Sequence, residues 1–192
     1  MPRLEGRIDV LVVSLGTTGG WRAAAAELAG SLERVGAAVA TVVPEAVPEV
    51  RTLALTDFVQ ARAVRRAAQA GIERHHPRSL IYCSVTASLL WPRTGAVWLD
   101  AIAAENRPGR HGVWQRTVER RRLCQSPLVM AMSEGSLAPL CDPHAPVVTV
   151  PVPVEPSGGP AAVGPSGDPR VDSDHFLWQI RHMSPVERHF SY

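Results

Sequence analysis

The chain has 192 residues, of which 45% are hydrophobic and 20% are charged, and its formal net charge is +2. These values are typical of a single globular domain with room for a small appendage. They exclude the strong field that steers anionic polymers, so we expect no nucleic-acid partner, although all twenty basic residues are arginines. No apolar run reaches the ~20 residues of a membrane span and no secretory signal is recognisable, so we expect a cytoplasmic protein.

The N-terminal quarter of the chain predicts a β-α-β unit. Residues 8–15 are almost continuously apolar, as expected for a strand that is covered on both faces of a parallel sheet. They lead into a glycine-rich loop at 16–20 and then into a helix with an unbroken apolar stripe that ends at Gly36. Residues 37–43 predict the second strand, which a right-handed crossover places parallel to the first.

The alternation of strands and helices continues along the chain. Residues 51–55 predict a short strand, and Asp57 is a candidate N-cap for a helix with an apolar stripe from Phe58 through Ala61, Val64 and Ala68. Further strands are predicted at 80–85, 96–99, 128–132 and 147–150, with a helix at 112–125.

This pattern predicts an α/β fold, a Rossmann-like, doubly wound parallel sheet of six or seven strands over residues 1–155. Residues 156–169 are rich in proline and glycine, and together with the rest of the chain to 192 they predict a linker and an irregular tail. The three cysteines are widely spaced and form no Cys-x-x-Cys pair, so we expect neither a disulfide framework nor a metal site.

Ligands of open α/β sheets bind beyond the carboxyl ends of the strands, and two loops there carry suggestive residues. The loop after the first strand contains Gly19 and Gly20, which let the backbone approach a phosphate or sugar, or which simply form a tight turn. Asp100 directly follows the strand at 96–99 and is placed either to accept hydrogen bonds from substrate hydroxyls or to cap the next turn.

Two further loops at this edge are candidates. Arg107 and Arg110 lie in a Gly/Pro loop before the helix at 112–125, where guanidinium groups suit phosphates and carboxylates. Ser133 and Glu134 follow the strand at 128–132; they are a candidate N-cap and a favourable charge for the helix dipole, or residues of a binding cleft.

These four loops, in this order, resemble the N-terminal domain of a GT-B glycosyltransferase of the family 4 type. The resemblance rests on the segments VLVVSLGTTGGW, IYCSVTA, WLDA, ENRPGRHGVWQR and SPLVMAMSEGSL, and it covers roughly residues 7–156. It implies the transfer, with retention, of a sugar from a nucleotide-diphosphate donor to an acceptor, without a metal or another cofactor.

The resemblance also implies site residues and partners. It places Asp100, the candidate catalytic residue, at the sugar hydroxyls, Gly19 and Gly20 at the phosphate and acceptor, Arg107 and Arg110 on the acceptor side, and Ser133 and Glu134 at the cleft. The second domain of the family, which holds the nucleotide, has no counterpart after Glu155. We therefore expect the acceptor-binding half, inactive without a separate C-terminal domain, and in contact with a membrane if the acceptor is a lipid.

Two other functions stay open at this point. A dinucleotide-binding Rossmann protein would have G-x-G-x-x-G after the first strand and an acidic residue at the end of the second. Glu45 supplies the acid, but the spacing of the glycines in GTTGG is different. A non-catalytic fragment that binds an acceptor or a partner would share the fold and differ only in having no turnover.

Overall fold

The computed structural model describes residues 7–45, 50, 52–102, 107, 109, 112–133, 136 and 146–152. All of them belong to one compact unit that ends at residue 153. Within these residues, six strands form one all-parallel sheet in the order β2-β1-β3-β4-β5-β6. The strands are β1 (Val10–Ser14), β2 (Val39–Val42), β3 (Ser79–Cys83), β4 (Ala96–Leu99), β5 (Val129–Ala131) and β6 (Val147–Thr149).

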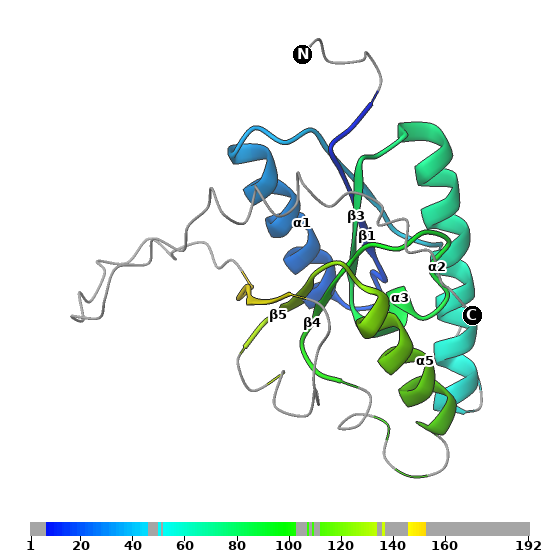
Figure 1. Cartoon of the computed structure of the whole chain (residues 1–192). Coiled ribbons are helices and arrows are strands. Elements are labelled where there is room, and N and C mark those ends of the chain that lie inside the picture. The colour runs from blue at the N-terminus through cyan, green and yellow to red at the C-terminus, as the bar shows by residue number, and fades with distance from the viewer. Residues whose placement is uncertain are drawn as a thin grey trace, which may run out of the picture. The chain divides into compact units, whose positions relative to one another are not determined.

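Helices cover both faces of the sheet (Figure 1). Because β2 and β3 lie on opposite sides of β1, right-handed crossovers place α1 on one face and α2 on the other. The later connections run in the same direction as the one through α2, so α3 and α5 share its face. The helices are α1 (Gly19–Arg34), α2 (Leu53–His75), α3 (Val85–Ser88) and α5 (Val113–Gln125). The predicted α/β fold with a parallel sheet is confirmed.

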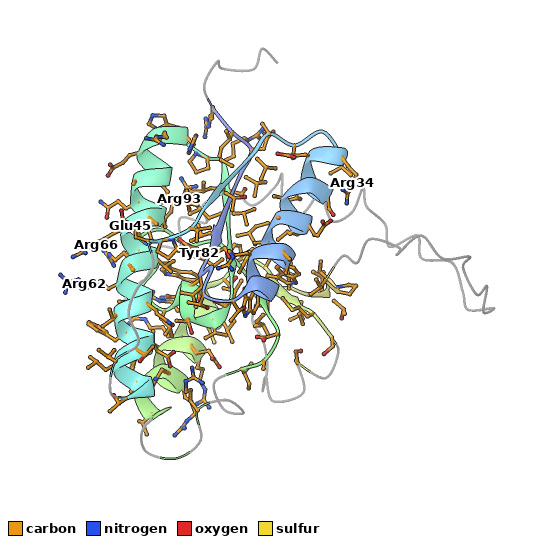
Figure 2. All side chains as sticks on the ribbon, turned by 180° about the vertical axis from the view of Figure 1, so that it is seen from behind. Arg34, Glu45, Arg62, Arg66, Tyr82 and Arg93 are labelled. Carbon is orange, nitrogen blue, oxygen red and sulfur yellow. The ribbon has the colours of Figure 1, made fainter. Side chains whose placement is uncertain are left out.

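The centre of the sheet is the core. All five residues of β1 and of β3 are buried, as the continuous apolar runs predict. Tyr82 on β3 is fully buried, and its hydroxyl donates a hydrogen bond of 2.7 Å to the carbonyl oxygen of Arg93 (Figure 2). Burial raises the pKa of Tyr82 above its ordinary value and that of the neighbouring Cys83 thiol to about 12. Cys83 is therefore a protonated thiol in the core at neutral pH, as is usual for a buried structural cysteine.

The start of α2 differs from the sequence prediction. Residues 53–55 form the first turn of the helix, so the short strand at 51–55 is wrong. Thr52 is the N-cap, with its hydroxyl oxygen accepting from the Leu55 N–H at 3.3 Å, and Asp57 lies one turn inside the helix, where it is buried. Threonine and aspartate are both good N-caps, so the sequence alone does not decide between them. Asp57 instead accepts hydrogen bonds from Arg107, a residue distant in sequence, from a position within the helix. Ala61, Val64 and Ala68 are buried as predicted, whereas Phe58 is exposed.

Several predictions fall on residues outside the described ones. These are the linker and tail at 156–192, Cys141, and the candidate site residues Arg110 and Glu134. Among the described helices, none is long and apolar enough to cross a membrane.

The close approach of β3 to the start of β4 gives a test of the fold. A Cβ atom added at Gly95 would lie 2.7 Å from the backbone oxygen of Leu80, so Gly95→Ala should lower the free energy of unfolding by about 1–3 kcal/mol. Gly30, inside α1, is the control: its added Cβ would meet only an arginine side chain, at 3.5 Å. Gly30→Ala should raise the free energy of unfolding by about 0.5–1 kcal/mol, because alanine is the better helix former. Urea unfolding measures both, and equal midpoints for the two variants would contradict this packing.

Candidate functional site

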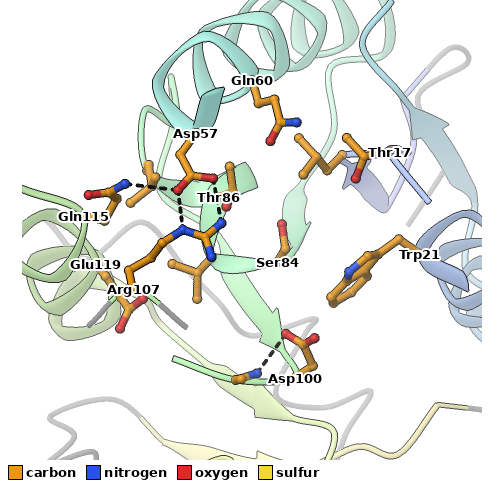
Figure 3. A pocket seen from close by; sticks show the side chains of 14 residues that line it. Thr17, Trp21, Asp57, Gln60, Ser84, Thr86, Asp100, Arg107, Gln115 and Glu119 are labelled. Carbon is orange, nitrogen blue, oxygen red and sulfur yellow. Dashed lines mark hydrogen bonds and ion pairs between the residues drawn. The ribbon is translucent and has the colours of Figure 1, made fainter. Parts of the chain in front are cut away.

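A pocket of about 230 Å³ lies at the carboxyl edge of the sheet (Figure 3). The strand order reverses at β1, so the loop after β1 turns to one face of the sheet and the loop after β3 turns to the other. Such a divergence opens a crevice between the two loops, which is where doubly wound proteins bind ligands. Thr17 from the first loop and Ser84 from the second both line the pocket, with Asp100 after β4.

One wall of the pocket is aromatic. Trp21, in the first turn of α1, packs edge-on against the buried Trp98 of β4, with ring centroids 6.3 Å apart. The indole N–H of Trp98 donates a hydrogen bond of 2.9 Å to the carbonyl oxygen of Val150, which fixes its ring. Trp21 therefore presents a positioned aromatic surface beside the Asp100 carboxylate (Figure 3).

Asp100 lies where the sequence places it, directly after β4, and its side chain is exposed. One carboxylate oxygen accepts from the Ala101 N–H at 2.8 Å, as the turn-capping alternative predicts. The residue also lines the pocket, where hydrogen bonding to substrate hydroxyls stays a prediction. The Ser136 hydroxyl donates to the backbone oxygen of Asp100 and lies 2.9 Å from the Ser133 hydroxyl. Ser133 thus supports the Asp100 loop through Ser136 and is not among the residues that line the pocket.

Arg107 lines the pocket, but its guanidinium is held by the carboxylate of Asp57. Its Nε and Nη2 atoms donate to the two oxygens of Asp57 at 2.7 and 3.0 Å, and Gln115 donates to the same carboxylate at 3.0 Å. Asp57 is only 4% exposed. Its hydrogen bond raises the pKa of Arg107. This bidentate pair ties the loop before α5 to the second turn of α2. The sequence suggested Arg107 as a ligand contact, but here its guanidinium is bonded to Asp57.

The charges of the described lining residues favour a neutral ligand over an anionic one. Among the described residues that line it, the charged groups are three carboxylates and one guanidinium, and the guanidinium is paired with Asp57. The other two carboxylates belong to Asp100 and Glu119. The exposed Asp100 carboxylate would repel an anion close to it, whereas a hydroxyl could donate a hydrogen bond to it. The side chains of Thr17, Ser84, Thr86 and Gln60 add groups that both donate and accept.

Ser84 holds a strained backbone conformation at the pocket. Its φ of 138° and ψ of 161° lie in a region that glycine occupies almost exclusively. Its hydroxyl oxygen accepts from the Ala87 N–H at 3.1 Å, which fixes the turn from β3 into α3. Such strain costs about 1–3 kcal/mol and persists only where the surroundings enforce it. Strained residues cluster at functional sites, in keeping with the position of Ser84 in the crevice.

The glycine pair lies beside the pocket. Gly19 and Gly20 are the first residues of α1, are exposed, and have open space where a side chain would begin. The tight turn depends instead on Gly16, which has φ of 67° and whose added Cβ would overlap Val43. The proposed phosphate contact of the pair stays a prediction, while its neighbours Thr17 and Trp21 line the pocket.

Sequence reasoning missed several lining residues that the same rule could have found. Ser84 directly follows a buried strand, as Asp100 does, and Thr17 follows β1 after a short turn. No signal in the sequence pairs Asp57 with Arg107, which is fifty positions away. In the described part of the chain, no three His, Cys, Asp or Glu side chains are grouped so that they could hold a metal ion.

Comparison of the chain with protein-family models, curated proteins and solved structures finds no match. The function must therefore be argued from the pocket itself.

A double-mutant cycle tests the Asp57–Arg107 pair. Asp57→Asn and Arg107→Met should each lower the free energy of unfolding, with a coupling of about 1–3 kcal/mol between them, because the carboxylate is buried and the contact is bidentate. The Asp9–Arg78 pair is the control: its atoms are 3.6 Å apart and its side chains are 34% and 56% exposed. Its coupling should stay below about 1 kcal/mol. Additive effects at Asp57 and Arg107 would show that the pair does not anchor the loop.

Proposed function

We propose that this domain binds the hydroxylated acceptor of a retaining, GT-B-type sugar transfer. The observation that carries the proposal is the pairing of Trp21 with the exposed Asp100 carboxylate across one pocket. An aromatic wall offers apolar surface to the face of a sugar or cyclitol ring, and the carboxylate accepts hydrogen bonds from its hydroxyl groups. Three of the four loops on which the resemblance to family 4 enzymes rests contribute described residues to this pocket: Thr17, Asp100 and Arg107.

The size of the pocket and its charges support an acceptor over a phosphate. A volume of about 230 Å³ falls below the ~300–1,000 Å³ of sites for drug-sized ligands, so it suits one ring of a larger molecule. Arg107, the arginine among its described lining residues, is bonded to Asp57. In the proposed reaction the nucleotide diphosphate is held by a second Rossmann domain, and Asp100 orients the attacking hydroxyl or the transferred sugar.

A dinucleotide-binding protein is the second candidate, because the pocket lies at a topological switch point, which is where such cofactors bind. A pyrophosphate would need donors and positive charge at this crevice, and the described lining supplies more carboxylates than guanidinium groups. A non-catalytic acceptor-binding protein shares every feature of the pocket and differs only in turnover.

The proposal predicts weak, specific binding of neutral cyclic polyols. Titration of the ¹⁵N-labelled chain with methyl α-D-glucopyranoside and with myo-inositol should shift amide resonances in the loops after β1, β3 and β4. Asp100→Asn should weaken that binding at least about tenfold, since it removes a charge-assisted hydrogen bond. Asp9→Asn, which changes a carboxylate at the start of β1, should leave it unchanged.

Two results would contradict the proposal. Tight NAD binding with no response to the polyols, seen by calorimetry, would favour a dinucleotide-binding function. Sugar transfer from a nucleotide sugar by this chain alone would show that the donor does not need the second domain that we assign to it.

A further inference from the structure

The outward face of α2 combines an apolar end with an arginine-rich shaft. Leu55 is 47% exposed and Phe58 is 42% exposed, both in the first two turns of the helix. Arg62 and Arg66 follow at spacings of four residues, which keeps them on the same side of the helix, and both project away from the sheet (Figure 2). A helix end that exposes a leucine and a phenylalanine to water is unfavourable unless something covers it.

The start of α5 extends the same surface. Val113 is 52% exposed, and Trp114 packs edge-on against Phe58 with ring centroids 6.2 Å apart. The exposed Arg120 and Arg121 lie two turns further along α5. Both helices begin at the lower end of the view in Figure 1. We call Leu55, Phe58, Val113 and Trp114 the tip patch, and Arg62, Arg66, Arg120 and Arg121 the arginine band.

The spacing along the helix axes fits one kind of partner. A rise of 1.5 Å per residue places Arg62 about 6 Å and Arg66 about 12 Å from Phe58 along α2. Each headgroup layer of a bilayer is about 5–8 Å thick, so a tip patch at the acyl boundary would put the band at or just above the lipid phosphates. Helical side chains lean toward the N-terminus, which carries the guanidinium groups toward the same phosphates.

We propose that the tip patch and the arginine band form a docking surface for an anionic lipid bilayer. A bilayer supplies an apolar phase and, at the headgroup spacing, a layer of negative charge that attracts arginines close to the surface. A nucleic acid would complement the band and leave the tip patch in water. Within α2 and α5 themselves, the exposed charged residues are arginines apart from Glu73, near the far end of α2.

The tip patch and the arginine band lie next to the pocket, and none of their residues is among those that line it. Asp57 and Gln60 line the pocket from the same two turns of α2 that expose Leu55 and Phe58 outward. Docking would therefore hold the pocket near the headgroups, within reach of a lipid-borne ligand. The surface stands independently of the sugar transfer proposed above, because none of its variants alters Asp100 or Trp21.

Co-sedimentation of the full chain with vesicles tests the proposal. Vesicles of phosphatidylcholine mixed with phosphatidylserine should bind the protein, pure phosphatidylcholine far less, and added salt should weaken the binding. The double variant Arg62→Gln/Arg66→Gln should lower the affinity about 30-fold, from about 1 kcal/mol per arginine. Leu55→Ser/Phe58→Ser should lower it at least about tenfold. Thermal unfolding shows that each variant is folded.

Matched controls lie at the opposite end of the fold. Val35 is 39% exposed and Arg34 is exposed at the end of α1, far from Arg62 and Arg66 in Figure 2. Arg34→Gln and Val35→Ser should leave vesicle binding unchanged. An equal loss in the controls, equal binding to neutral vesicles, or no binding at all would overturn the proposal. Binding of a duplex oligonucleotide that depends on Arg62 and Arg66, without vesicle binding, would replace it with a nucleic-acid surface.

Discussion

Parallel pairing of β1 with β2 on one side and with β3 on the other is the constraint on which the rest of the structure depends. Parallel neighbours require crossovers, crossovers place helices on both faces, and strands covered on both faces must be apolar throughout. The same pairing brings all carboxyl ends to one edge and parts the loops after β1 and β3. The crevice that holds Trp21, Ser84 and Asp100 is thus a consequence of strand order.

That constraint explains how much the sequence could predict. Strands such as 96–99 can be predicted from their continuous apolar runs. A polar residue directly after such a strand, like Asp100, lies at the carboxyl edge of the sheet, where ligands bind. The prediction for the start of α2 is wrong because Thr52 and Asp57 have the same local N-cap preference. Only the bond between Asp57 and the distant Arg107 shows that Thr52, and not Asp57, caps the helix. Long-range polar pairs have no periodic signature, so their partners emerge only from the three-dimensional structure.

The arginines show why composition alone misleads. Arg107 lies in a loop that the sequence offers as a ligand contact, yet two of its five N–H donors are bonded to the Asp57 carboxylate. Arg62 and Arg66 look in the sequence like ordinary solvated residues of a helix, and they gain interest only beside an exposed Leu55 and Phe58. One residue type therefore serves as an internal tie in one place and as an external charge in another, and burial of the neighbouring carboxylate makes the difference.

The first two turns of α2 bring the two proposals into contact. Successive residues of a helix point about 100° apart, so Asp57 faces the pocket while Phe58 faces outward. A soluble acceptor would use the pocket and give the exposed Phe58 no role. An acceptor anchored in a bilayer would be held by both faces of the same turn, its ring in the crevice and its anchor in the phase that covers the tip patch. Taken together, the two proposals favour a lipid-borne acceptor over a soluble one.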